Sequence, residues 1–260
     1  MALLMDIDED PLTDSSGEGN TGALQSAGHP NFTATAYFDG GYIFDNINDF
    51  INGGDLDVFD SATEISFVGW FYVDQISADD YMIENADAYG GGGFLWFRDD
   101  IFGARTDVYR VTLYDSADAS ATDLATPSSS TPATTWTHVA FTADLGSATG
   151  LRLYVGGVEV GDSPADISAI GAIDSGAGTL TLGTNSFAAL GKYFDGTMDE
   201  IAGFIDILTS TEINDIMDNG LEGAAGGVIK TLNGLIWANI KTINGVAKAS
   251  ISTINGAAAQ

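Results

Sequence analysis

Hydrophobic and polar positions over residues 1–222 alternate in many short runs. β-Branched and aromatic residues are interrupted by Gly, Asp, Ser and Asn, a pattern typical of strands joined by turns. The run from Ile65 to Val73 is apolar at nearly every position, so both of its faces are expected to be covered. We therefore expect an all-β sandwich with strands at Ala2–Ile7, Ala34–Phe38, Tyr42–Phe44, Glu64–Val73, Tyr81–Glu84, Gly93–Arg98, Val108–Tyr114, Thr135–Ala143, Leu151–Val155, Thr179–Gly183, Gly196–Met198 and Glu200–Ile207.

One segment of this region has the period and the end signals of a helix. Thr209 or Ser210 can cap its start, Glu212 follows in the first turn, and Gly220 marks its end. We expect this short helix to cover one edge of the sandwich. The segment 116–135 is rich in Ala, Ser, Thr and Asp and is expected to be a surface loop.

The C-terminal residues repeat with a period of 11. The segments Ile229-Lys-Thr-Leu-Asn-Gly, Ile240-Lys-Thr-Ile-Asn-Gly and Ile251-Ser-Thr-Ile-Asn-Gly show the repeat. An 11-residue apolar period suits a right-handed supercoiled helix, whereas Asn-Gly in each repeat favours short strands and tight turns. Strands and turns are the preferred of the two. We expect a folded domain over 1–222, a Gly/Ala joint over 223–227 and an assembly tail of three repeats over 228–260.

Charge divides the chain at the same place. All 37 acidic residues lie within the first 222 positions, with five basic residues, which gives this part a charge of −32. The remaining 38 residues have three Lys and no acid. Such a negative surface repels nucleic acid and suits metal cations. The chain has no Cys, which excludes disulfides and thiol catalysis, and no recognisable secretory signal or apolar run long enough to span a membrane.

Several segments resemble the laminin-G-like, concanavalin A-like lectin/glucanase jelly roll, and they follow one another in that family's order. The resemblance covers about residues 3–221 and implies a two-sheet jelly-roll sandwich with one short helix. The matching segments are Asp14-Ser-Ser-Gly-Glu-Gly-Asn20, Tyr37-Phe-Asp-Gly40, Ile65-Ser-Phe-Val-Gly-Trp70, Trp136-Thr-His-Val-Ala-Phe-Thr142, Leu153-Tyr-Val-Gly-Gly157 and Phe194-Asp-Gly-Thr-Met-Asp199-Glu200-Ile.

The resemblance also implies a structural Ca²⁺ ion. Its ligands here would be Asp14, Asn20 and Asp199, because hard oxygen ligands suit this ion. Glu18 stands where the family usually has Asn. Enzymes of the family carry paired glutamates at a spacing that this sequence lacks, so we expect no catalytic activity. Trp70 and Trp136 are expected to be structural residues of the core, and His138 is expected to make a structural hydrogen bond in its buried strand.

The tail resembles the I-K-x-I-N-G-V-A repeats near the ends of phage-encoded structural proteins. The leading hypothesis is therefore a virion protein, such as a decoration, fibre or tail-associated subunit. Its partners would be other virion proteins or copies of itself, for instance in a trimer. The expected assembly residues are Ile236, Trp237, Ile240, Ile243 and Ile254.

An extracellular carbohydrate-binding module or adhesin is the alternative function, and a glycoside-active enzyme is a weaker third. For the binding module, surface aromatics near the Gly-rich segment would stack on sugars; Tyr89, Phe94, Trp96 and Tyr109 are the candidates. The competing interpretation places Phe94 and Trp96 inside the sandwich, and it is preferred.

Overall fold

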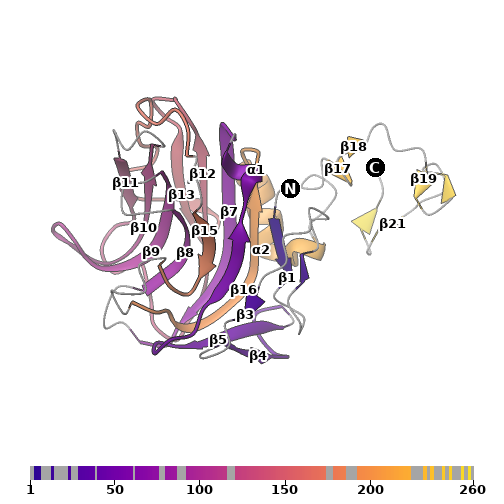
Figure 1. The fold of residues 1–260 in the computed structure, drawn as a ribbon, viewed down its shortest axis with the longest axis horizontal. Helices are drawn as coiled ribbons and strands as arrows, with labels where there is room; N and C mark the ends of the chain where they lie inside the picture. The colour runs from indigo at the N-terminus through magenta and orange to yellow at the C-terminus, as the bar shows by residue number, and fades with distance from the viewer. Residues whose placement is uncertain are drawn as a thin grey trace.

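Two antiparallel sheets lie face to face in the computed structural model, and helix α2 lies on the outer side of one of them (Figure 1). The structure describes residues 29–38, 40–60, 62–75, 80–86, 92–115, 121–173, 178–185 and 192–223, with short paired segments at 3–6, 13–14, 23–24 and in the tail. This arrangement confirms the expected all-β, two-sheet jelly-roll sandwich with a short helix.

The sheet next to α2 has nine strands. In spatial order they are β14 (Val158–Glu159), β13 (Leu151–Val155), β12 (Trp136–Asp144), β7 (Glu64–Val73), β16 (Asp195–Phe204), β1 (Leu3–Asp6) and β2 (Thr13–Asp14), with β5 (Gly41–Asp45) paired to β16 and β4 (Asn31–Thr33) paired to β5.

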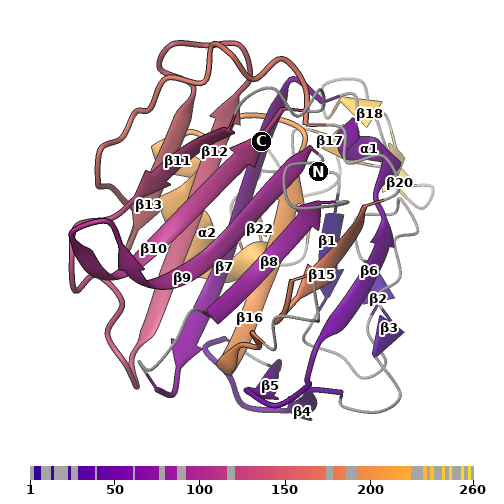
Figure 2. The ribbon, with the colours of Figure 1, turned by 60° about the vertical axis from the view of Figure 1, so that its left-hand side comes forward.

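The opposite sheet has seven strands and faces the viewer in Figure 2. In spatial order they are β11 (Ala121–Ala125), β10 (Arg105–Tyr114), β9 (Gly93–Phe102), β8 (Asp80–Ala86), β15 (Thr179–Leu182), β6 (Ile51–Asp55) and β3 (Ala23–Leu24).

Aromatic side chains from both sheets meet in the core. Successive residues of a strand point to opposite faces, so Phe67 and Phe71 of β7 reach the interior while Val68 and Trp70 point outward. The rings of Phe67 and Phe141 stack 5.5 Å apart, and Phe94 of the other sheet lies 4.7 Å from Phe67. Both faces of β7 are buried, as its apolar sequence predicts.

The strand predictions differ from the structure in several places, and β6 and β14 are strands that were not expected. Residues 34–38 form bends rather than a strand, and β4 lies just before them. Residues 196–207 form one strand, β16, up to Phe204 instead of two. The expected loop at 116–135 contains β11, whose polar sequence suits the edge position it occupies beside β10.

Helix α2 (Ser210–Gly223) begins with the expected cap. The Thr209 Oγ1 atom accepts a hydrogen bond from the Glu212 N–H at 3.3 Å, and Glu212 Oε2 accepts one from the Thr209 N–H at 2.8 Å. This reciprocal pair is a capping box. Gly220 interrupts the helix with φ of 71°. A second helix, α1 (Asp57–Asp60), forms a single turn.

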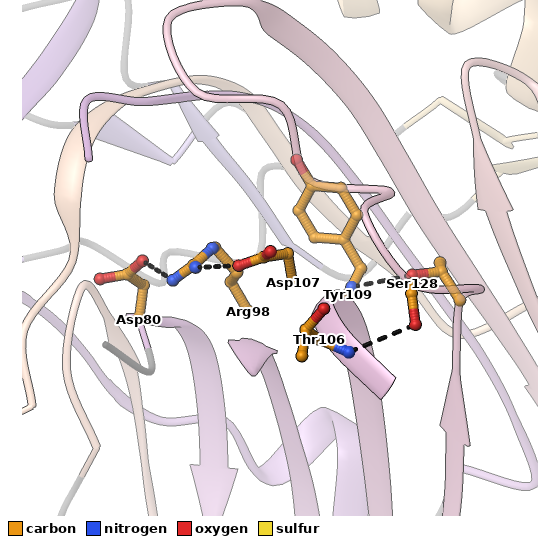
Figure 3. A network of polar contacts seen from close by, with 7 residues as sticks. Asp80, Arg98, Thr106, Asp107, Tyr109 and Ser128 are labelled. Carbon is orange, nitrogen blue, oxygen red and sulfur yellow. Dashed lines mark hydrogen bonds and ion pairs between the residues drawn. The ribbon is translucent and has the colours of Figure 1, made fainter. Parts of the chain in front are cut away.

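A fully buried arginine joins three strands at one end of the sandwich (Figure 3). The Arg98 guanidinium is 0% exposed and lies 2.9 Å from a carboxylate oxygen of Asp80 and 3.0 Å from one of Asp107. Close by, the Tyr109 N–H donates to Thr126 Oγ1 at 3.0 Å. Paired and hydrogen-bonded in this way, a charge is tolerated in the interior.

The tail contains three small hairpins, each of which is a two-stranded sheet of its own. They consist of β17 (Thr231–Leu232) with β18 (Leu235–Ile236), β19 (Thr242–Ile243) with β20 (Val246–Ala247), and β21 (Thr253–Ile254) with β22 (Ala257–Ala258). Each pair flanks an Asn-Gly dipeptide, the sequence that favours two-residue hairpin turns. The tail therefore has strands, the preferred of the two expected conformations.

Candidate functional site

The outer face of the nine-stranded sheet is organised in rows of side chains that cross β12, β7 and β16. The first row contains Thr142, Ser66 and Phe204, and the second row lies under α2. Val68, Ala140 and Ala202 form the second row and are fully buried together with Ile213 and Ile216 of the helix. Helix α2 thus covers the second row, and Leu221 near its end packs against the same cluster.

The third row contains His138, Trp70 and Asp199, which are paired across the three strands. Beyond α2, the segment before β5 covers this row. The ring of Tyr37 lies on the Trp70 indole with centroids 3.4 Å apart and planes 17° apart. Asp199 holds this segment, because its Oδ2 atom accepts hydrogen bonds from the N–H groups of Tyr37 at 2.8 Å and Phe38 at 2.9 Å.

A β-bulge in β16 places two acidic residues on the outer face. The pairing with β7 shifts between Asp199 and Ala202, and Glu200 adopts φ of 56°, which is uncommon for a residue other than Gly. Glu200 Oε2 accepts a hydrogen bond from the Leu221 N–H at the end of α2. Asp199 and Glu200 therefore fasten the Tyr37 segment and the helix end from neighbouring positions.

The fourth row is open to solvent, and we call it the aromatic row. It contains Trp136, Tyr72, Thr197 and Ile43, which are paired in this order across β12, β7, β16 and β5. Trp136, Tyr72 and Thr197 are half-buried, and Ile43 is 39% exposed. The rings of Trp136 and Tyr72 are 5.6 Å apart.

Tyr37 adds an exposed ring beside this row. Its side chain is 41% exposed, and its ring centroid lies 6.0 Å from that of Trp136 in an edge-to-face arrangement. One face of the Tyr37 ring is covered by Trp70, which fixes its orientation. Such a partly exposed, braced set of aromatic rings can stack on the apolar face of a flat ligand.

His138 packs against Trp70 in the third row, next to the aromatic row. It is 1% exposed, it meets the Trp70 ring edge-to-face at 5.3 Å, and neither ring nitrogen has a hydrogen-bond partner among the described residues. Burial lowers the pKa of His138 to about 3, so the imidazole is neutral at ordinary pH. His138 is therefore part of the packing, whereas the sequence predicts a structural hydrogen-bonding role for it.

The structure corrects the sugar-contact residues expected from the sequence. Phe94, Trp96 and Tyr109 are all 0% exposed, because their positions in β9 and β10 point between the sheets. They cannot stack on a ligand outside the sandwich, and Tyr89 lies outside the described residues. Trp70 is buried as expected, but Trp136 is only half-buried and borders the surface.

The expected calcium ligands are only partly described. Asp199 is fully buried, with one carboxylate oxygen taken up by two backbone N–H groups. Asn20 and the side chain of Asp14 lie outside the described residues. Within the described part of the chain, no group of three or more His, Cys, Asp or Glu residues is placed to hold a metal ion. The calcium site stays a prediction.

The expected assembly residues fall in and between the tail hairpins. Ile236 lies in β18, Ile243 in β19 and Ile254 in β21, whereas Trp237 and Ile240 lie outside the described residues. Sequence reasoning did not single out Tyr37, Tyr72 and Ile43 as surface residues. All three lie in expected strands, but the sequence does not say which face of the sheet stays uncovered.

Comparison with known proteins agrees with the fold. Residues 44–214 match the family described as the concanavalin A-like lectin/glucanases superfamily. The chain therefore belongs to this superfamily. No significant match was found among curated proteins.

Solved structures of binding domains share the architecture at low sequence identity. Domain 4 of the GH43 extracellular arabinanase AbnA from Geobacillus stearothermophilus, solved with arabinotriose, superposes with a TM-score of 0.63 at 17% identity, covering 83% of this chain and 97% of that one. The binding domain of Paraclostridial Mosquitocidal Protein 1 superposes with a TM-score of 0.67 at 14% identity, covering 85% of this chain and 52% of that one.

The botulinum neurotoxin DC binding domain, solved with rat synaptotagmin II, gives a TM-score of 0.60 at 13% identity, covering 84% of this chain and 51% of that one. The chain thus spans about half the length of the two toxin domains. Among the helices that the structure describes, none is long and apolar enough to cross a membrane.

Proposed function

We propose that this protein is a non-enzymatic carbohydrate-binding protein whose sandwich is mounted on a larger particle, a virion, by its C-terminal repeats. The observation that carries the binding role is the aromatic row with Tyr37 beside it. A pyranose ring has an apolar face that stacks on Tyr and Trp. Here the Trp70 indole stacks on one face of the Tyr37 ring and holds that ring in place.

The roles of the nearby acidic residues support binding rather than catalysis. Asp199 and Glu200 are neighbouring acids beside the aromatic row, and both accept hydrogen bonds from backbone N–H groups. They serve the structure of the loop and the helix end. The arabinanase domain solved with arabinotriose has the same fold, which makes a sugar ligand a reasonable first choice.

The binding role is tested on a glycan array with the full-length protein and two variants. Tyr37→Ala removes the exposed ring and should reduce binding about five- to thirtyfold, since stacking of this kind contributes about 1–2 kcal/mol. Val158→Ala is the matched control, because Val158 is a 63% exposed apolar residue at the far edge of the same sheet. Equal binding by Tyr37→Ala and the unmodified protein would place any glycan site elsewhere.

The virion role is supported by the tail. Its three repeats lack acidic residues and each contains a paired hairpin. Ten large apolar residues within 229–254 give it more apolar surface than so short a segment buries alone. Attachment to other virion proteins or to copies of the same tail would cover that surface.

Co-sedimentation with particles from the native source tests this second role. Trp237→Ala should reduce incorporation and leave glycan binding intact, because Trp237 occurs in only one repeat and is the best single anchor. Tyr37→Ala should show the opposite behaviour. A full-length protein that is monomeric and absent from particles would leave only the free carbohydrate-binding protein.

A further inference from the structure

The row beyond the aromatic row is acidic, and we call it the acidic row. It contains Asp74, Asp195 and Asp45, which lie two positions along the strands from Tyr72, Thr197 and Ile43. Asp195 is paired with Asp45 across β16 and β5, and the Asp74 N–H donates to the Asp195 carbonyl at 2.9 Å. Because side chains two residues apart point to the same face of a sheet, both rows face the same solvent.

The acidic row is not neutralised by the described part of the protein. None of the ion pairs between described residues includes Asp45, Asp74 or Asp195. Partial burial raises the pKa of Asp195, and the charges of Asp74 and Asp45 raise it further. The three carboxylates thus create a zone of negative potential at one side of the aromatic row.

Negative potential also surrounds this zone. The first 222 residues have a charge of −32, and Asp49 lies beside the acidic row, where its Oδ2 atom accepts a hydrogen bond from the Asp45 N–H at 3.1 Å. A ligand on the aromatic row therefore approaches these carboxylates, with His29 the basic group that acts on Asp49.

We infer that the aromatic row takes uncharged glycan chains and excludes anionic ones. This inference rests on the proposed carbohydrate-binding function and specifies its ligand class. The rows are two residues apart along each strand, which corresponds to about 7 Å. Three carboxylates at that distance would weaken the binding of a ligand anion about tenfold at low ionic strength. Sugar hydroxyls, in contrast, can donate hydrogen bonds to the same carboxylates.

The first experiment measures the binding of the full-length protein to two sets of immobilised polysaccharides. The uncharged set contains arabinan, glucan, mannan and galactan, and the anionic set contains alginate, heparin and polysialic acid. Binding confined to the uncharged set and lost in Tyr37→Ala supports the inference. Tyr37-dependent binding to the anionic set at low ionic strength overturns it and leaves the proposed function standing. Absence of Tyr37-dependent binding to both sets overturns the proposed function itself.

The second experiment removes one charge. The uncharged ligand found in the first experiment is compared with its carboxymethylated derivative, using Asp195→Asn and the control Asp55→Asn. Asp55 is exposed at the end of β6 in the opposite sheet, so the control makes the same change in net charge. Asp195→Asn should reduce the ratio of the affinities for the uncharged and the carboxymethylated ligand about two- to threefold, and Asp55→Asn should leave this ratio unchanged. Equal effects of the two substitutions would overturn the inference.

Discussion

Tyr37 and Asp199 are 162 residues apart in sequence, yet the N–H of the first donates a 2.8 Å hydrogen bond to the carboxylate of the second. This bond, with its neighbour from Phe38, fixes the segment whose Tyr37 ring lies on Trp70. The most exposed ring of the candidate site therefore depends on a buried acid in a distant strand.

Replacing Asp199 tests this dependence. Asp199→Ala leaves two partly buried N–H groups without their acceptor and should lower the free energy of unfolding by about 2–4 kcal/mol. Release of Tyr37 from Trp70 should also weaken the near-ultraviolet circular dichroism of the coupled rings. Asp199→Asn keeps an acceptor oxygen and should retain most of both properties. Identical behaviour of the Ala and Asn variants would contradict the anchoring role.

Two arginines in ion pairs should respond very differently to truncation. Arg98 is 0% exposed, and Arg98→Ala leaves the buried Asp80 without its arginine, so we expect a loss of about 3–5 kcal/mol in denaturant unfolding. Arg152 pairs with Glu159 at the surface at 2.8 Å, and Arg152→Ala should cost at most about 1 kcal/mol. Similar losses for both variants would show that Arg98 is less essential than its burial implies.

Asp195 should destabilise the folded protein at neutral pH. Its pKa is raised in the folded state, which means that folding favours the protonated carboxyl. The protonated carboxyl therefore contributes to stability at acidic pH, and this contribution is lost as the pH rises through the raised pKa. Asp195→Asn should therefore raise the melting temperature at pH 7, by an amount equivalent to up to about 1 kcal/mol. The increase in melting temperature should be smaller in high salt and should disappear at a pH below the ordinary carboxyl pKa. A lower melting temperature at neutral pH would contradict this prediction.

His138 should make the domain sensitive to acid. The unfolded imidazole binds a proton near pH 6.5, whereas burial lowers the folded pKa to about 3, so stability is present above pH 6.5 and is lost as the pH falls toward 3. A shift of this size corresponds to about 4–5 kcal/mol. His138→Leu should remove this part of the pH dependence, and His29→Gln, at an exposed position, should not. Unchanged pH profiles in both variants would exclude His138 as the source.

Calcium should raise the melting temperature if the site implied by the family resemblance forms. A ligand that binds only the folded state at 100 times its Kd adds about 2.7 kcal/mol. Asp14→Asn should reduce the effect, and Asp8→Asn, outside the implied ligand set, should preserve it. A melting temperature that is the same in EDTA and in excess calcium would argue against the site.

The sequence predicts the fold well because strand signals are local. β7 and β13 have the expected bounds, and Thr209 and Glu212 form the expected cap. The strand at 121–125 was missed because its sequence is polar and its pairing with β10 depends on a distant segment. Local pattern therefore identifies most elements but misses strands with polar or glycine-rich sequences, such as β11 and β6.

The candidate site could not be predicted in the same way, because exposure depends on which rows are covered. In Phe94-Leu-Trp-Phe every residue is apolar, so the sequence does not reveal that Trp96 points inward. Trp70 and Trp136 lie on the same outer face, yet the Tyr37 segment covers the first and leaves the second half-buried. Only the three-dimensional arrangement distinguishes them.

The bulge in β16 has a consequence for how this surface can change through evolution. Glu200 is the extra residue that places it and Asp199 next to each other on the outer face, one holding the Tyr37 segment and the other the end of α2. Losing one residue here would restore regular pairing and disturb both anchors in a single step. Substitutions in the helix or in the Tyr37 segment can therefore change each of them separately. A deletion in the bulge, in contrast, alters both attachments together.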